Sequence, residues 1–206
     1  MPWPMADLCN KARDSYTLHD VHGDDSASIS LVYKNGNSLS GDSGSNTLLA
    51  GSGNDTLNGG KGNDVLVGGK GNDTLIGGEG DDIFMWLKGD QGTPSSPSRD
   101  VINDFGMGGS DKNGKDVLDL HDLLDGEGRN SDLSTYLNFS KSSDGKDTLL
   151  KISSGGGLNG AASNYDQLIT FKGVDLTAGH SLNSSSDQNA LIRDLIDQGK
   201  LKVDQG

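Results

Sequence analysis

Aspartates recur at intervals of nine residues in the first half of the chain, at Asp55, Asp64, Asp73 and Asp82. Each follows a glycine by two positions and precedes a leucine or phenylalanine by two positions. Carboxylate oxygens and the backbone carbonyls of glycine-rich turns are the hard oxygen ligands that Ca²⁺ prefers in proteins. The spacing therefore predicts a regular series of calcium sites.

The aspartates belong to a longer repeat, which runs from Gly41 to Met85. Divided into nines, this stretch reads GDSGSNTLL, AGSGNDTLN, GGKGNDVLV, GGKGNDTLI and GGEGDDIFM. Glycine recurs at the first, second and fourth places, aspartate at the sixth and an apolar residue at the eighth. A flexible linker is the alternative interpretation of this composition, but a linker does not require a fixed aspartate with an apolar partner two places later.

The residue types indicate which elements position the aspartates. Glycine allows the positive φ angles and close backbone approach of a tight turn, so the first six places form a loop whose carbonyls converge. The last three places form a short strand whose eighth-place residue points inward. Two nonapeptides then complete one coil of a right-handed parallel β-roll. This predicts two ladders of stacked ligands, one with Asn46, Asp64 and Asp82 and the other with Asp55 and Asp73.

The repeat resembles the calcium-binding nonapeptide of the RTX (repeats-in-toxin) family, G-G-x-G-x-D-x-U-x. In that family each ion lies between stacked turns. One turn contributes its second- and fourth-place carbonyls and its aspartate, and the next contributes its first- and third-place carbonyls and its aspartate. The resemblance implies two sites here, one with Gly51, Gly53 and Asp55 facing Gly68, Lys70 and Asp73, the other with Gly60, Gly62 and Asp64 facing Gly77, Glu79 and Asp82.

Within these implied sites, Lys70 and Glu79 contribute backbone oxygen only. Asn46 replaces the expected aspartate of the first copy, which makes a site there weaker. The register also extends beyond the five copies, because Asp100 lies eighteen residues after Asp82 and predicts a further site on the same ladder. Between Asp82 and Asp100 the nonapeptide pattern is broken, and Asp90 is predicted to replace the missing aspartate on the Asp73 ladder. The stretch 92–98 is then expected to bulge from the coil as a loop.

The composition of the whole chain agrees with a metal-dependent fold. The 206 residues include 32 glycines, only 31% are hydrophobic and the net charge is −13. Nucleic acid is excluded as a partner because the chain lacks clustered Lys and Arg, and no apolar run is long enough for membrane insertion. A single cysteine rules out an intrachain disulfide. Calcium is therefore expected to supply the folding free energy that the small core lacks.

Three regions are expected along the chain: an N-terminal segment (1–39), interpreted as the tail of a preceding module, the β-roll (40–105) and a β-rich C-terminal cap (106–206). In the cap, strands are predicted at 136–140, 148–153 and 167–171, the first two joined by a turn at Asp144-Gly145. The predicted fold class is therefore all-β, a right-handed parallel β-roll followed by a β-rich cap with a short helix.

The short helix is predicted near the end of the cap. Its N-cap is expected at Ser186 or Asp187 and its end at Gly199, with a final strand at 201–203. Its apolar residues Ala190, Leu191, Leu195 and Ile196 follow an i, i+1, i+5, i+6 spacing, which indicates an amphipathic helix.

The resemblance to RTX proteins extends over 41–206. The runs DDIFMW, DVINDF, DVLDLHDLLDGE, GVDL and ALIRDLIDQGKLKVD are similar to the C-terminal type I secretion target domain of large bacterial RTX adhesins. The resemblance implies a non-catalytic module that is disordered at low cytosolic calcium. Such a module is exported by an ABC-transporter apparatus that engages its C-terminal region, without an N-terminal signal peptide. It folds in extracellular calcium as a monomer, secreted or on the cell surface.

Two alternative functions stay open at this point. RTX tails also end secreted hydrolases and toxins, although the chain contains no H-E-x-x-H or G-x-S-x-G motif and its histidines lack a matched nucleophile. A ligand-binding adhesin module is the other alternative, for which the sequence shows no aromatic-rich platform. Catalysis is not expected within these residues.

Overall fold

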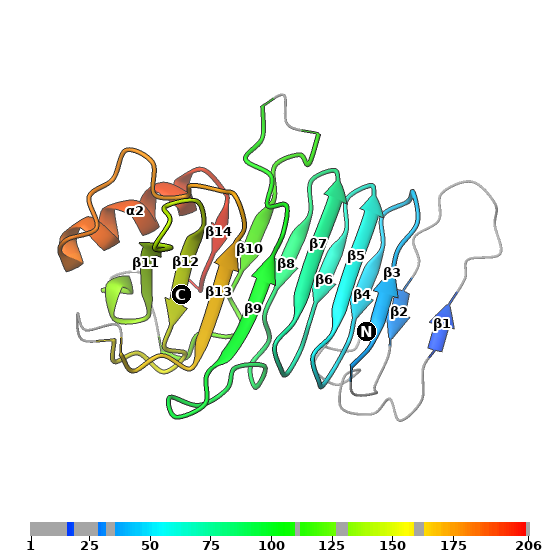
Figure 1. Cartoon of the computed structure of the whole chain (residues 1–206), viewed down its shortest axis with the longest axis horizontal. Coiled ribbons are helices and arrows are strands. Elements are labelled where there is room, and N and C mark those ends of the chain that lie inside the picture. The colour runs from blue at the N-terminus through cyan, green and yellow to red at the C-terminus, as the bar shows by residue number, and fades with distance from the viewer. Residues whose placement is uncertain are drawn as a thin grey trace.

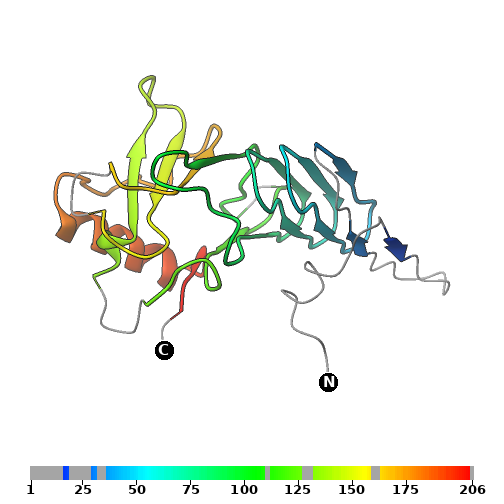
Figure 2. The same cartoon turned by 90° about the horizontal axis from the view of Figure 1, so that it is seen from below.

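The computed structural model of the chain describes residues 16–18, 29–31, 36–109, 112–126, 132–158 and 163–204. These residues form an elongated molecule of two long β-sheets, with one α-helix at the end opposite the first strands (Figure 1). Figure 2 shows the two sheets of the roll facing each other. No helix in these ranges is long and apolar enough to cross a membrane. The predicted fold class, all-β with a parallel β-roll, a β-rich cap and a short helix, is confirmed.

Successive strands of the repeat alternate between the two sheets. Sheet A contains, in spatial order, β1 (Tyr16–Leu18), β2 (Ile29–Leu31), β4 (Thr47–Leu49), β6 (Val65–Val67), β8 (Ile83–Met85), β10 (Val117–Asp119) and β14 (Leu201–Lys202). Sheet B contains, in spatial order, β11 (Leu137–Lys141), β12 (Thr148–Ile152), β13 (Gln167–Phe171), β9 (Ser98–Ile102), β7 (Thr74–Glu79), β5 (Thr56–Lys61) and β3 (Ser38–Ser40).

Neighbouring repeat strands are parallel, and their eighth-place residues stack. In sheet A, Leu48 pairs with Leu66 and Leu66 with Phe84, and in sheet B, Leu57 pairs with Leu75. Side chains alternate between the two faces of a strand, so all five residues point into the space between the sheets. Each is fully buried. The prediction of two nonapeptides per coil is therefore confirmed.

The cap prolongs both sheets of the roll. β13 pairs in parallel with β9, and the antiparallel hairpin of β11 and β12 continues sheet B from there. The hairpin turns through Gly145, whose φ of 73° suits glycine, as the Asp144-Gly145 pair predicts. The three strands predicted for the cap are confirmed within one residue at each end.

Helix α2 (Ser185–Asp197) packs against β11 and β14, and a 3-10 helix, η1 (Leu133–Thr135), lies beside it. The N-cap of α2 is Ser184, whose hydroxyl accepts the N–H of Asp187 in a capping box. The predicted N-cap was therefore two or three residues late, because the serines that precede Asp187 offer several equivalent capping side chains.

The buried face of α2 follows a different spacing from that of its apolar residues. Gln188, Leu191, Ile192 and Leu195 are buried, whereas Ala190 is exposed. The buried residues follow i, i+3, i+4, i+7, but the first of them, Gln188, is polar, so a pattern of apolar residues alone does not reveal this face.

One hydrophobic core runs through roll and cap. The ring of Phe105 contacts both Phe84 of the roll and Phe171 of the cap, with centroids 6.0 Å and 5.2 Å apart. The boundary predicted after residue 105 falls within this continuous core. Of the predicted N-terminal segment, the described residues include β1, β2 and 36–39; β2 pairs in parallel with β4, which adds it to sheet A.

Candidate metal centre

First-place glycines lie beside the aspartate carboxylates of their own turns. A Cβ atom on Gly59 would lie 2.3 Å from Asp64 Oδ2 and 2.5 Å from the carbonyl oxygen of Gly77 in the next turn. A Cβ atom on Gly68 would lie 2.4 Å from Asp73 Oδ2. Glycine at the first place thus keeps open a space on which a carboxylate oxygen and a carbonyl oxygen converge.

The sixth-place aspartates form two ladders of hydrogen bonds. In each ladder, the backbone N–H of one sixth-place residue donates to Oδ1 of its counterpart in the next turn. The distance is 2.8 Å both from Asp55 N to Asp73 Oδ1 and from Asp64 N to Asp82 Oδ1. Asn46 joins the second ladder through its N–H to Asp64 Oδ1. The two groups of residues are those that the sequence spacing predicts.

The other carboxylate oxygen of these aspartates has no partner. Among the described residues, Oδ2 is buried without a hydrogen-bond donor in Asp55, Asp64, Asp73 and Asp82, and each residue is at most 2% exposed. Burial raises the pKa of Asp64 to about 6 and the pKa of Asp73 and of Asp82 to about 7. An ionised carboxylate is unfavourable in such surroundings unless a positive charge accompanies it. The four oxygens therefore require either protons or cations.

Backbone oxygens near the first predicted site would complete the coordination of a cation. No three His, Cys, Asp or Glu side chains in the described ranges lie close enough together to hold a metal ion. The stacked turns nevertheless bring carbonyls together, since Gly53 N donates to Lys70 O at 2.8 Å and Lys70 N donates to Gly51 O at 2.7 Å. Each carbonyl keeps a second lone pair. One carboxylate oxygen with several carbonyls is a donor set that fits Ca²⁺.

The second predicted site is assembled in the same way. Gly62 N donates to Glu79 O at 2.8 Å, and Gly60 pairs with Gly78 in the parallel register. The side chains of Lys61 and Glu79 form an exposed ion pair of 2.9 Å, so these third-place side chains lie outside the turn. The structure thus brings the predicted residues together, and the ligand role of each stays a prediction.

Comparison with known proteins agrees with this geometry. Residues 35–66 and 58–85 match the RTX calcium-binding nonapeptide repeat. The solved R3 subunit of the mannuronan C5-epimerase AlgE6 from Azotobacter vinelandii is 32% identical, with a TM-score of 0.52, over 69% of this chain and 74% of that chain. This chain belongs to the RTX calcium-binding repeat family.

A second subunit of the same epimerase is also similar to this chain. The R2 subunit of the same epimerase is 28% identical over 66% of this chain and 79% of that chain, with a TM-score of 0.46. Curated protein sequences include no match to the chain.

Asp100 continues a different RTX ladder from the one predicted. β9 pairs with β7, and Asp73 N donates to Asp100 Oδ1 at 2.7 Å, so Asp100 follows Asp73 and not Asp82. The prediction was wrong because it assumed one nonapeptide for each half-coil. A loop at 86–97 separates β8 from β9 and doubles the length of that half-coil, which moves Asp100 to the opposite side of the roll.

Asp90 lies on neither ladder. Its Oδ2 accepts the N–H of Leu87 at 2.8 Å, a contact within the loop that leads to β9. Asp73 N donates to Asp100, so Asp90 does not take the ladder position that the sequence predicts, and its role as a metal ligand stays a prediction.

The sequence prediction missed one ladder position, Asp116. Its Oδ1 accepts the N–H of Asp82 at 2.9 Å, although 34 residues separate the two. Gly114 precedes Asp116 by two places and Leu118 follows it by two, which matches the fourth, sixth and eighth places of the RTX template. β10 also pairs with β8, which sets Leu118 beside Phe84. This G-x-D-x-L pattern could have identified Asp116, but the two glycines that begin the nonapeptide template are absent here.

Asn46 is a weaker candidate calcium ligand than the aspartates in the structure as well. Its Oδ1 accepts the N–H of Asp42 at 2.8 Å, and its Nδ2 donates to Asp42 Oδ1 at 3.2 Å. The amide thus closes its own turn and brings no charge to a cation.

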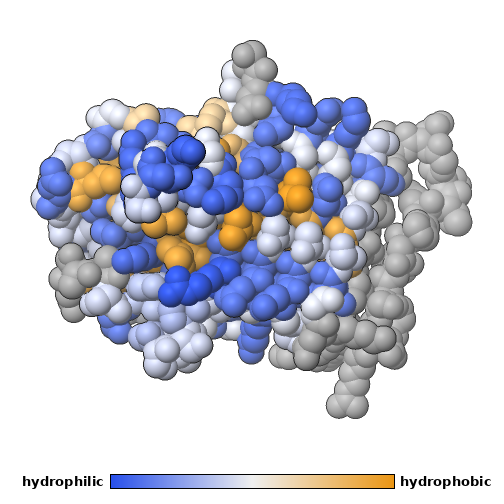
Figure 3. All heavy atoms as spheres, in the orientation of Figure 1, coloured by the Kyte–Doolittle hydropathy of each residue, from blue (hydrophilic) through white to orange (hydrophobic). Residues whose placement is uncertain are grey.

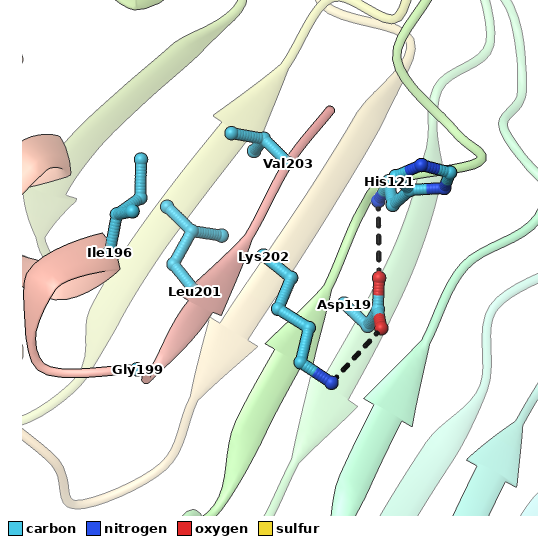
Figure 4. Close-up of a pocket in the computed structure, with 7 residues that line it drawn as sticks. All are labelled: Asp119, His121, Ile196, Gly199, Leu201, Lys202 and Val203. Carbon is cyan, nitrogen blue, oxygen red and sulfur yellow. Dashed lines mark hydrogen bonds and ion pairs between the residues drawn. The ribbon is translucent and has the colours of Figure 1, made fainter. Parts of the chain in front are cut away.

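A pocket of about 390 Å³ lies beside β10 and β14 (Figure 4). It is lined by Asp119, His121, Ile196, Gly199, Leu201, Lys202 and Val203, and includes none of the ladder aspartates. Asp119 accepts the backbone N–H of His121 at 3.2 Å and forms an ion pair of 3.6 Å with Lys202. Because its charged groups pair with one another, the pocket adds no calcium ligand.

Proposed function

We propose that this RTX module is a non-catalytic folding and export module of a larger bacterial adhesin. It is disordered at low cytosolic calcium, passes through a type I ABC-transporter apparatus and folds in extracellular calcium. The observation that carries the proposal is the set of four buried Oδ2 atoms without partners. When ionised, these carboxylates need a cation to remain inside the fold, so calcium binding contributes directly to folding.

Helix α2 supports the order of export before folding. Leu191, Ile192 and Leu195 are buried in the folded cap. They belong to the same core as the roll residues, so loss of calcium from the roll also weakens the packing of the cap. A transporter that contacts this apolar face therefore has access to it only before folding. The similarity of 190–204 to type I secretion targets agrees with this role.

Circular dichroism of the full chain tests the calcium dependence. The β-sheet spectrum is expected to appear at about 0.1–1 mM calcium, the range to which extracellular calcium modules are tuned, and to disappear in EDTA. Magnesium at the same concentrations is the matched control, because it demands near-ideal octahedral geometry and gives up its water reluctantly. A β-sheet spectrum that survives EDTA unchanged would refute the proposal.

Export is tested with a passenger protein fused to the N-terminus of the chain, in cells that carry a type I transporter. Deletion of 187–206 is expected to abolish the appearance of the passenger outside the cell. The control variant, Asp64→Asn with Asp73→Asn, loses two ladder carboxylates but keeps the tail, and is expected to be exported more slowly. Equal export with and without 187–206 would contradict the assignment of the tail.

One surface feature favours a second function, the binding of an anionic ligand. Arg99 Nη2 donates to the hydroxyl of Tyr165 at 3.1 Å, and Lys151 Nζ lies 5.2 Å from the centre of the same ring. The ion pairs within the described part of the chain involve neither cation. On a chain of net charge −13, these two cations form a local site of opposite charge.

The neighbouring side chains suit a carboxylated polysaccharide. The register places Lys151, Leu168 and Arg99 side by side on β12, β13 and β9, on the outer face of sheet B that Figure 3 views. A saccharide across these strands would set its carboxylates against the cations and an apolar ring face on Leu168. The similar epimerase subunit comes from an enzyme named for mannuronan, a polymer of carboxylated sugar.

Calorimetry with mannuronan in the presence of calcium tests this second function. Arg99→Ala with Lys151→Ala is expected to weaken binding by at least about tenfold, or about 1.4 kcal/mol. Lys172→Ala is the matched control, because Lys172 already pairs with Asp147 at 2.6 Å. Absence of binding by the unchanged chain would contradict the proposal.

A further inference from the structure

Asp100 is the last aspartate of the ladder that contains Asp73, and its hydrogen bonds differ from those of the aspartates before it. Oδ1 of Asp100 accepts the Asp73 N–H, as on the other rungs. Its Oδ2, however, accepts two further hydrogen bonds, each of 2.7 Å, from Trp86 Nε1 and from Gln167 Nε2. The oxygen that lacks a partner on the earlier rungs is thus occupied here by two protein donors.

The last rung of the second ladder shows the same substitution. Oδ1 of Asp116 accepts the Asp82 N–H, and its Oδ2 accepts the N–H of Gly106 at 2.6 Å. Gly106 lies in the loop that leads from β9 to β10, outside the nonapeptide array. Both ladders therefore end on a carboxylate whose two oxygens are satisfied by the protein.

These donors are held inside the molecule. Trp86 is 2% exposed, and Gln167 and Asp116 are fully buried. A cation beside either terminal carboxylate would have to displace a buried N–H group and leave it without an acceptor, which is unfavourable in a water-free interior. Beside the four earlier carboxylates a cation displaces no donor.

We propose that Trp86, Gln167 and the N–H of Gly106 replace calcium at the ends of the two ladders. Four ions then bind, one beside Oδ2 of each of Asp55, Asp64, Asp73 and Asp82, and none binds beside Asp100 or Asp116. The inference rests on the calcium-dependent folding proposed above and specifies where the series of ions stops.

The connectivity explains why the ions stop at this point. In the stacked arrangement that the family resemblance implies, the ion beside an aspartate also takes carbonyl ligands from the turn that follows it along the ladder. Beyond β9, sheet B continues with β13 and then with the antiparallel β12, so no nonapeptide turn follows. Neutral hydrogen-bond donors from the loop and the cap take the place of the missing ion, and they join the roll to the cap.

Anomalous diffraction from crystals of the full chain grown in calcium tests the positions directly. Four calcium peaks are expected, each at about 2.4 Å from one of the four unpaired Oδ2 atoms. A peak beside Oδ2 of Asp100 or Asp116, in place of the hydrogen bonds from Trp86, Gln167 or Gly106, overturns the proposal. This measurement needs no variant, so it decides the question even if a variant fails to fold.

Native mass spectrometry of isosteric variants provides the second test. The unchanged chain is expected to bind four ions, Asp64→Asn and Asp73→Asn three each, and Asp100→Asn and Asp116→Asn four each. Six ions on the unchanged chain, with five on Asp100→Asn and on Asp116→Asn, overturn the proposal. Absence of bound calcium from every form overturns the proposed function itself, and this result is distinct from six ions.

Discussion

The roll and the cap satisfy their buried polar groups in opposite ways. In the roll, four aspartates keep one buried oxygen without a protein partner. In the cap, the side-chain amide of Gln188 accepts the N–H of Phe139 at 2.9 Å and donates to the C=O of Phe139 at 3.0 Å. Phe139 lies on the edge strand β11. Asp166 is likewise bonded by the hydroxyl of Ser154 at 2.6 Å. The roll therefore depends on a component of its solvent, whereas the cap provides partners for these groups and, among the described residues, leaves only Gln167 Oε1 buried without one.

Calcium removal is expected to show this difference most strongly. As calcium is lowered, the backbone amides of 41–85 should lose protection first, and those of β11, β12 and α2 should follow at lower calcium, because the shared core links the two regions. Hydrogen exchange read by mass spectrometry at a series of calcium concentrations measures the order. Earlier loss of protection in the cap would contradict the greater dependence of the roll on calcium.

Leu66→Ala is expected to have the next largest effect. Leu66 is fully buried in the core between the sheets. The truncation is expected to cost about 2–5 kcal/mol and to raise the calcium concentration at which the roll folds. Calcium titrations followed by circular dichroism measure this shift. The control is Thr56→Ala, an exposed position on β5, which should change stability by less than about 0.5 kcal/mol.

Gln188→Met tests the cap separately from the roll. The substitution keeps the length of the side chain but leaves the N–H and C=O of Phe139 without partners, at an expected cost of about 1–3 kcal/mol. Thermal unfolding in saturating calcium measures the loss, and the number of bound ions should stay unchanged. The exposed Arg193→Met on the same helix is the control. A change in ion number with Gln188→Met would contradict the separation of the two regions.

The smallest expected effect is a dependence of calcium affinity on pH. Burial raises the pKa of Asp73 and of Asp82 to about 7 in the calcium-free roll, so below pH 7 protons compete with calcium. Because the pKa of these carboxyls is raised in the fold, protonation stabilises the calcium-free fold at low pH. This stabilisation is lost as pH rises through about 7 and the carboxyls ionise. Calcium affinity should therefore increase from pH 6 to pH 8, by about tenfold per pH unit for each displaced proton.

Carboxylates of the cap should not contribute to this dependence. Hydrogen bonds from Lys172 and Lys141 lower the pKa of Asp147 and of Asp175, respectively. Their stabilising contribution is complete above the ordinary pKa of an aspartate and is lost only as pH falls below it. Calcium titrations at pH 6, 7 and 8 measure the effect, and an unchanged midpoint would contradict the raised values in the roll.

Much of the fold was predictable because local rules govern it. The period of nine identified which residues stack, and the Asp144-Gly145 pair identified the hairpin of the cap. The start of α2 was misplaced because several neighbouring serines can cap a helix. The ladder of Asp100 was misassigned because a loop inside one half-coil changes the side of the roll, and the length of a loop does not reveal which strand its end will join.

By itself, the sequence determined the repeat, its inward-facing residues and the two groups of aspartates, because each depends on the conformation of a single nonapeptide. The tertiary structure alone decided which carboxylates lack a partner. Asp73 and Asp100 have the same apolar spacing in sequence, yet only Asp100 is reached by Gln167, which lies 67 residues away, and by Trp86. That difference arises where the cap packs against the last coil, and contacts between distant segments leave no local pattern in the chain.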